Sequence, residues 1–173
     1  MTGDDRWYEA AFVVGITNAL NVVADGLAPS LPPLDESAAG PEAAAVFADA
    51  RAFYELPAGE VVAPLAVVAR DPAYLADLWG AVKHAFTERR LTRRHKEALA
   101  FAVSLTTRSA FGTRFHLAQL RRLGAGERGV MEIVGVTQMF SSYTKIADTL
   151  QLASDMANIA PVDRSGVPDA GPG

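Results

Sequence analysis

The chain has 173 residues, half of them hydrophobic, with a formal net charge of −4 and no cysteine. Its length and apolar content suit a single domain with a sizeable core, and its acidic balance argues against general nucleic-acid binding. Without cysteine, the chain has no disulfide, no thiolate metal site and no thiol nucleophile.

The N-terminal sequence and the spread of apolar residues predict a cytoplasmic protein. The opening "MTGDDRWYEAAF" is acidic where a signal peptide would be basic. No apolar run approaches the roughly 20 residues that cross a bilayer. We therefore expect neither a membrane nor a nucleic acid as a partner.

Apolar residues follow the spacing of helices along almost the whole chain. They recur at i, i+3, i+4 and i+7, and the alternation typical of strands is missing. This pattern predicts an all-α fold of about six or seven helices. The expected helices are Asp4–Gly26, Glu42–Tyr54, Gly59–Ala69, Pro72–Glu88, Thr92–Thr107, Ser109–Leu123 and Glu127 to about Met156.

Several junctions carry residues that begin or end helices. Asp71 can cap a helix whose first residue is proline, and Gly124 is a stop signal after "QLRRL". The Pro-rich stretch 28–41 is expected to be a linker inside a single domain, residues 1–160. Residues 161–173 have too few apolar side chains to fold, which predicts a disordered tail.

Two of the expected helices resemble each other in sequence. Glu9–Leu27 aligns without gaps on Glu132–Leu150, and both stretches begin with Glu and end with Ala-Asp-x-Leu. Chance similarity between apolar helices explains this as well as a duplication does. If the repeat is real, two equivalent helices flank the centre of the fold.

The middle of the chain holds the residues that point to chemistry. Ser109, Gly112 and His116 share one face of a predicted helix, at the spacing of a Cys-x-x-Cys pair followed by a histidine. The preceding helix has an all-apolar stretch, so we expect it to be buried with Glu97 at its mouth. If the two helices form an antiparallel hairpin around Arg108, Glu97 faces His116.

These residues occur in a sequence context that resembles a known family. With "RRLG" at 121–124 and a long helix that begins "GERGVMEIV", they resemble the alkyl hydroperoxidase D-like and carboxymuconolactone decarboxylase family over about residues 60–152. The resemblance implies an AhpD-like helical bundle around a central antiparallel hairpin. It also implies a homo-oligomer, as a dimer, trimer or hexamer. The apolar helices at 11–23 and 130–150 also favour an oligomer. Each is apolar on more than one face, and a chain of this size has too little interior to bury all of those faces.

The hydroperoxidase branch of this family reduces peroxide with a Cys-x-x-Cys pair and a glutamate–histidine proton relay. By resemblance, Glu97 and His116 occupy the relay positions, whereas Ser109 and Gly112 stand where both cysteines would be. A serine hydroxyl is neither acidic nor soft enough to attack an O–O bond. Thiol peroxidase activity is therefore not expected.

The decarboxylase branch lacks the cysteine pair and acts on a small lactone acid without a metal or an organic cofactor. By resemblance, Glu97 and His116 would be general base and general acid for decarboxylation, dehydration or isomerisation of a small organic molecule. Arg108 and Arg114 flank the turn and could hold the carboxylate of an anionic substrate. No metal is expected either, because the remaining histidines lack carboxylates at ligand spacing.

Four further residues are secondary candidates for the same pocket. Ser142 and Tyr143, on the last helix, would form its other wall. Asn18 and Asn21 lie in the otherwise apolar first helix, where an unpaired amide is costly, so each needs a partner. The pocket, a second subunit or a backbone group could supply that partner.

Two other interpretations stand beside the acid–base enzyme. Glu97 and His116 could be a structural pair in a non-catalytic assembly or ligand-binding protein that has lost its redox residues. A residual hydroperoxidase is the third interpretation, and it would rest on family membership alone.

The basic run "ERRLTRRHK", residues 88–96, has no interleaved aromatic side chain and predicts a solvated helix start.

Overall fold

The computed structural model describes residues 4–151, which form helices and connecting segments without a strand. This confirms the all-α prediction. The elements are α1 (Asp4–Asn21), the π-helical turn η1 (Val22–Leu27), the 3₁₀ turn η2 (Glu36–Ala38), α2 (Pro41–Tyr54), α3 (Ala63–Val68), α4 (Pro72–Phe86), α5 (Arg93–Thr106), α6 (Ala110–Arg122) and α7 (Glu127–Thr149).

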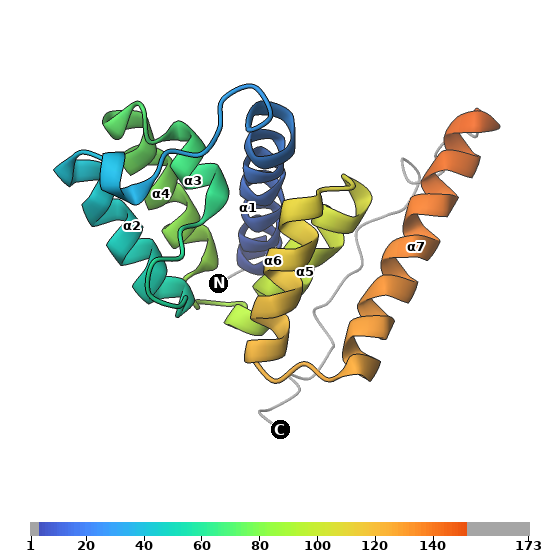
Figure 1. The fold of residues 1–173 in the computed structure, drawn as a ribbon. Helices are drawn as coiled ribbons and strands as arrows, with labels where there is room; N and C mark the ends of the chain where they lie inside the picture. Colours follow the sequence, from blue (N-terminus) through green and yellow to red (C-terminus); the bar gives the residue numbers. More distant parts are fainter. Residues whose placement is uncertain (1–3, 152–173) are drawn as a thin grey trace.

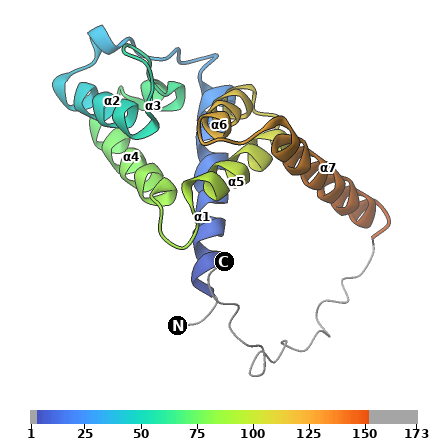
Figure 2. The ribbon, with the colours of Figure 1, turned by 90° about the horizontal axis from the view of Figure 1, so that it is seen from below.

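Helix α1 lies between two halves of the molecule (Figures 1 and 2). Helices α2, α3 and α4 lie on one side of it, the α5–α6 hairpin lies on the other, and α7 runs beyond the hairpin and contacts α5. The larger buried cluster is formed mainly by residues of α1, α2, α3 and α4, and it includes Phe47 and Tyr54 of α2. A smaller cluster, with Leu120 and Val130, joins the hairpin to the start of α7.

The helix bounds differ from the predicted ones at three places. Helix α7 ends at Thr149, short of the expected end near Met156, and Gln151 just beyond it has a left-handed backbone with φ 52°. Helix α3 begins at Ala63, because Gly59 has a left-handed backbone with φ 82° that helix residues do not adopt. Helix α1 ends at Asn21 and continues as η1, whose wider turn carries Asp25 toward the start of α6. The predicted domain boundary at 160 and the predicted tail 161–173 lie outside the described residues.

The first helical segment is long and apolar. Asp5–Leu27 spans 23 residues with a mean hydropathy of 1.5, which meets the length and composition of a membrane-spanning helix. The expectation that no run approaches that length is therefore wrong. A core helix passes the same test. Here Val13, Thr17 and Leu20 of α1 are buried, but only 22% of the tested window lies inside the protein.

Helix ends follow the predicted signals and add one unexpected residue. The Asp71 side chain accepts a hydrogen bond from the Tyr74 backbone N–H at 3.1 Å, and Gly124 follows α6 with φ 80°, so both predictions are confirmed. Helix α5 ends in the same left-handed manner at Arg108, with φ 58°. A side chain at such a position costs on the order of 1 kcal/mol.

A buried ion pair joins α1 to the start of α5. Lys96 is fully buried and donates to the carbonyl oxygen of Ala85 at 2.8 Å and to the carboxylate of Glu9. The other Glu9 oxygen accepts from the Arg90 backbone N–H at 2.9 Å. Burial alone would raise the pKa of Glu9, but the Lys96 hydrogen bond and charge and the backbone donors outweigh it, so this pKa lies below its usual value.

Replacing Glu9 with Gln is expected to lower the free energy of unfolding by about 2 kcal/mol at neutral pH, because buried Lys96 loses its counter-charge. Because the pKa of Glu9 is lower in the folded state than in the unfolded chain, its carboxylate stabilises the fold at pH values above the usual glutamate pKa. This contribution is lost as the pH falls through the lowered pKa of the folded state. The difference between wild type and Glu9→Gln should therefore narrow toward about pH 3 in urea titrations. Glu60→Gln, at an exposed site, is the control. A pH-independent difference would contradict the assignment.

Candidate functional site

Glu97 and His116 lie face to face inside the α5–α6 hairpin. His116 Nδ1 is 2.7 Å from Glu97 Oε2, and each side chain comes from the facing side of its helix. The predicted hairpin and the predicted meeting of the two groups are thus present. Glu97 is 0% exposed and His116 is 2% exposed, so the pair lies in the interior and not at the mouth of a pocket.

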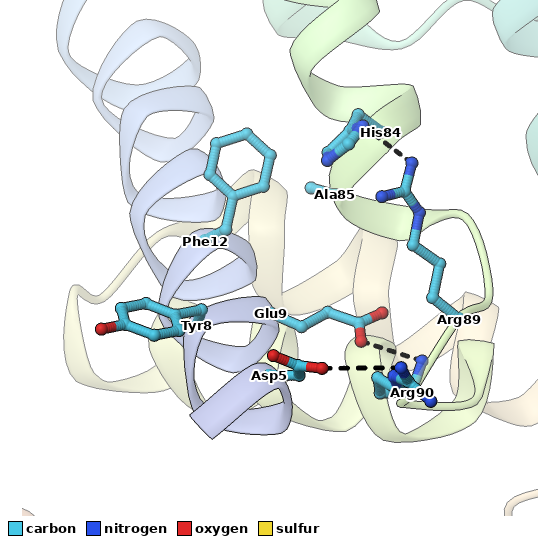
Figure 3. A pocket seen from close by; sticks show the side chains of 8 residues that line it. All are labelled: Asp5, Tyr8, Glu9, Phe12, His84, Ala85, Arg89 and Arg90. Atoms are coloured by element: carbon cyan, nitrogen blue, oxygen red, sulfur yellow. Dashed lines mark hydrogen bonds and ion pairs between the residues drawn. The ribbon is translucent and has the colours of Figure 1, made fainter. Parts of the chain in front are cut away.

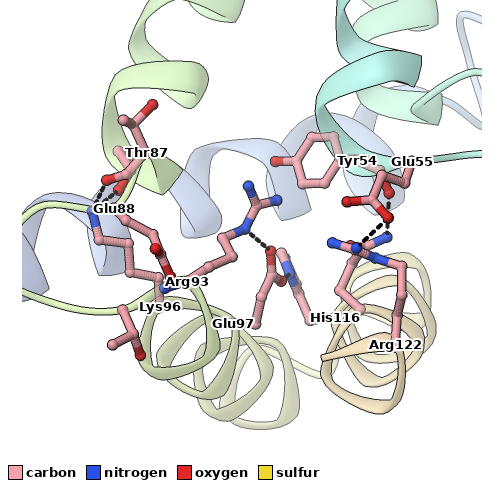
Figure 4. Close-up of polar contacts among 12 residues, drawn as sticks. Tyr54, Glu55, Thr87, Glu88, Arg93, Lys96, Glu97, His116 and Arg122 are labelled. Atoms are coloured by element: carbon pink, nitrogen blue, oxygen red, sulfur yellow. Dashed lines mark hydrogen bonds and ion pairs between the residues drawn. The ribbon is translucent and has the colours of Figure 1, made fainter. Parts of the chain in front are cut away.

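Arg93 completes a three-membered network that sequence reasoning missed. One helical turn before Glu97, its Nε donates to Glu97 Oε1 at 2.8 Å (Figure 4). Its guanidinium carbon lies 4.4 Å from the ring centroid of Phe53 and 4.8 Å from that of Tyr54, within the range of cation–π attraction. Both oxygens of the Glu97 carboxylate are therefore engaged by side chains.

Aromatic rings enclose this network. His116 stacks on Phe86 with centroids 5.8 Å apart and an interplanar angle of 8°, and Phe115 meets its edge at 5.3 Å. Burial, and then the Glu97 charge, raise the pKa of the nearby Tyr54 hydroxyl, so it stays protonated, although Arg93 acts in the opposite direction. A hydrogen-bonded pair packed in this way joins the two helices of the hairpin and leaves no open surface on either side chain.

Ser109 is the N-cap of α6 and also contacts η1. Its Oγ accepts from the backbone N–H of Gly112 at 2.9 Å and donates to the carboxylate of Asp25 in a short hydrogen bond. The other Asp25 oxygen accepts from the Phe111 backbone N–H at 3.4 Å. A carboxylate at this position also suits the positive end of the α6 dipole. No sequence pattern pointed to Asp25, because only the π-helical turn brings it to this position.

Asn21 fills the space in front of Gly112. Its Nδ2 donates to Ser104 Oγ at 3.2 Å and to Thr107 Oγ1 at 3.1 Å, which supplies partners for the amide nitrogen, whereas the buried Oδ1 accepts no hydrogen bond within the described residues. A Cβ on Gly112 would lie 2.2 Å from Asn21 Oδ1 and 2.4 Å from Ser104 Oγ. The position to which the family resemblance assigns the second cysteine therefore has no room for a side chain.

The structure does not bring the other predicted site residues to the Glu97–His116 pair. Asn18 and Arg114 are exposed to solvent. The Asn18 amide therefore needs no partner inside the protein, and the Arg114 guanidinium does not reach the pair. Arg108 lies at the far end of the hairpin, about 15 Å along α5 from Glu97. Ser142 and Tyr143 are exposed on α7 and line surface pockets there.

A further pocket lies elsewhere, between α1 and the end of α4 (Figure 3). Its volume is about 730 Å³, and its wall has mixed charge. Arg90 pairs with Asp5 at 3.5 Å, and Arg89 Nη2 lies 3.0 Å from His84 Nδ1. No sequence prediction concerned this pocket. Within residues 4–151, no group of three or more His, Asp or Glu residues is placed to hold a metal ion.

Comparison with known proteins supports the family resemblance. The model of the Carboxymuconolactone decarboxylase family matches residues 72–155, just under half of the chain. The alkylhydroperoxidase AhpD core from Rhodospirillum rubrum has a similar structure, with a TM-score of 0.63 and 25% sequence identity over 70% of this chain and 88% of that chain. No curated protein matches in sequence. The predicted AhpD-like, carboxymuconolactone decarboxylase-like nature of the chain, in a cysteine-free form, is confirmed.

Substituting Gly112 with Ala is expected to lower the free energy of unfolding by about 1–3 kcal/mol, since the new methyl group overlaps Asn21 Oδ1. Combined with Asn21→Ala, it should cost less than the sum of the two single variants. Thermal and urea unfolding of the four-member cycle measures this coupling. Gly80→Ala, in the open middle of α4, is the control and should not destabilise the protein. Additive effects at 21 and 112 would refute the close contact.

Proposed function

We propose that this chain is a self-associating protein of the carboxymuconolactone decarboxylase type that does not reduce peroxide. In this proposal the Arg93–Glu97–His116 network is structural, and the hairpin that holds redox groups in hydroperoxidases serves as a rigid core for assembly. The observation that carries the proposal is the complete burial of Glu97 and His116 among aromatic rings. A proton relay needs a reacting group within hydrogen-bond reach, and packing excludes one here.

The surface of α7 supports self-association. Six large apolar side chains, each between 52% and 66% exposed, form what we call the α7 ridge: Val136, Met139, Phe140, Tyr143, Ile146 and Leu150. At 3.6 residues per turn they fall on one side of the helix. A continuous apolar surface of this kind marks an interaction site more often than a solvent face. Val130 is the only residue of α7 that is buried within the described part of the single chain. The sequence predicted that more than one face of this helix is buried, and a partner would be needed for that.

The internal repeat supports a second copy of the chain as the occupant. In the ungapped alignment of Glu9–Leu27 on Glu132–Leu150, the first four ridge residues correspond to buried or partly buried positions of α1. Val136 matches Val13, and Tyr143 matches Leu20, both buried in α1. The ridge thus has the pattern of a helix that packs on helices of this same fold. A second copy supplies such helices, which favours a homo-oligomer over a foreign partner.

One observation favours acid–base catalysis as a second candidate function. The 2.7 Å contact between His116 Nδ1 and Glu97 Oε2 is the orientation that leaves Nε2 as the reactive nitrogen of a general acid or base. A movement of Phe86 or Phe115 would be needed to admit a small organic substrate to that nitrogen. Decarboxylation, dehydration or isomerisation without a cofactor would be the chemistry of such an opened site.

Replacing Tyr143 with Lys is expected to reduce the particle mass from that of an oligomer to that of a monomer, because it places a charge in the centre of the α7 ridge. Size-exclusion chromatography with light scattering measures the mass. Asp148→Lys, on the opposite side of the same helix, is the control and should keep the oligomer. A monomeric wild-type protein at micromolar concentration would refute self-association.

Glu97→Gln and His116→Gln are each expected to lower the free energy of unfolding by about 3 kcal/mol, since either change leaves a buried polar group without its partner. Urea titrations give this value, and wild type and variants should consume no peroxide in the presence of a thiol reductant. Variants that keep wild-type stability would contradict a structural pair. If such variants also lost turnover of a small lactone acid shown by the wild type, the pair would be catalytic.

A further inference from the structure

A groove of mixed character lies between the α5–α6 turn and α7. Its volume is about 580 Å³, within the range of small-molecule sites. Leu105 and Val134 contribute apolar surface, and polar side chains come from Arg108 in the turn and from Thr137, Gln138, Ser141, Ser142 and Lys145 of α7. Two basic side chains line the groove, and no acidic side chain does. An uncompensated positive charge in a concave site attracts an anion.

Arg108 occupies a backbone position that glycine would suit better. With φ 58° it ends α5, and the Ser109 backbone N–H closes the turn on the Ser104 carbonyl at 2.9 Å. Helix α6 ends in the same way at Gly124. Strained backbone of this kind clusters at functional sites, which makes the Arg108 side chain a candidate for binding.

The comparable residue at the end of α2 shows such a use. Glu55 has φ 52°, and its carboxylate pairs with Arg122 Nη1 at 2.7 Å. Arg108 has no such pair: within residues 4–151, neither it nor Lys145 lies within ion-pair distance of an acidic side chain. No ion pair within the described residues therefore accounts for an arginine at this strained position.

The hydroxyl groups of the groove indicate what else the ligand carries. Ser142 donates to the Gln138 carbonyl at 2.9 Å, and Thr137 donates to the Ile133 carbonyl at 2.7 Å. Each hydroxyl proton is thus taken by the helix, and each oxygen is left to accept. Acceptor oxygens suit hydroxyl groups on a ligand, whereas Arg108 and Lys145 suit its anionic end.

The orientation of α7 separates this groove from the α7 ridge. The groove residues and the ridge residues are centred on opposite sides of the helix at 3.6 residues per turn. Gln138 and Ser142 lie at the border, because they also line a hollow beside Tyr143. A second copy seated on the ridge would therefore leave Arg108 and the turn side of the groove accessible.

We propose that this groove binds a small hydroxylated organic anion, either a hydroxy acid or a phosphate monoester. Arg108 holds the carboxylate or phosphate with its planar guanidinium, and Lys145 adds a second charge from the facing wall. The hydroxyl oxygens of Thr137 and Ser142 accept from the hydroxyl groups of the ligand.

Titration calorimetry with gluconate and with glycerol 3-phosphate, at constant ionic strength, tests this proposal and distinguishes the two anion types. Saturable binding of either one to the wild type is expected, and acetate or inorganic phosphate should bind more weakly because they lack the hydroxyl groups. Saturable binding of neither probe would overturn the proposal, and equal binding of the hydroxyl-free anions would overturn the ligand class.

Arg108→Gly is the decisive variant, because glycine relieves the left-handed backbone while removing the guanidinium. Its Tm should equal or exceed that of the wild type, and its affinity for the bound anion should fall about tenfold or more. Arg114→Gln removes the same charge from an exposed site outside the groove and should keep the affinity. Equal loss in both variants would show general charge attraction and overturn the site.

The result is independent of self-association. Arg108→Gly should keep the particle mass of the wild type, and Tyr143→Lys should keep anion binding, because the two residues lie on different surfaces. Loss of anion binding in Tyr143→Lys would place the ligand between subunits and overturn a groove within one chain.

Discussion

Charged side chains buried at the start of α5 are the constraint on which the rest of the structure depends. Lys96 reaches Glu9 of α1, Glu97 reaches His116 of α6, and Arg93 lies against aromatic rings of the α2–α4 half. Each charge would be costly in the interior without its partner. One arrangement of these helices satisfies all of them, so α5 sets the positions of its neighbours through ionic contacts as well as apolar packing.

Polar side chains of the first helical segment fill the surroundings of Ser109 and Gly112. The Asn21 amide takes the space beside Gly112, and the Ser109 hydroxyl joins α6 to η1 through Asp25. Hydrogen bonds and close packing therefore connect the first helix to the hairpin at the two positions whose spacing resembles a Cys-x-x-Cys pair.

Helix α7 combines two surfaces. Its apolar ridge faces outward, whereas its other side packs Val130 and Val134 on the hairpin and carries the hydroxyl and basic side chains of the groove. An amphipathic helix on a globular protein normally turns its apolar side inward. The proposed assembly would bury the ridge, and the proposed ligand would occupy the groove on the other side.

The sequence by itself determined the helices, the hairpin around Arg108 and the meeting of Glu97 with His116, because helical periodicity and short connections fix which faces oppose each other. Only the tertiary structure decided whether that pair is open or sealed, since the enclosing rings come from α4 and α6. Asp25 and Arg93 were likewise beyond prediction: the first depends on a π-helical turn, and the second on aromatic partners distant in sequence. Burial and partner choice are properties of several segments at once, which a pattern within one segment does not contain.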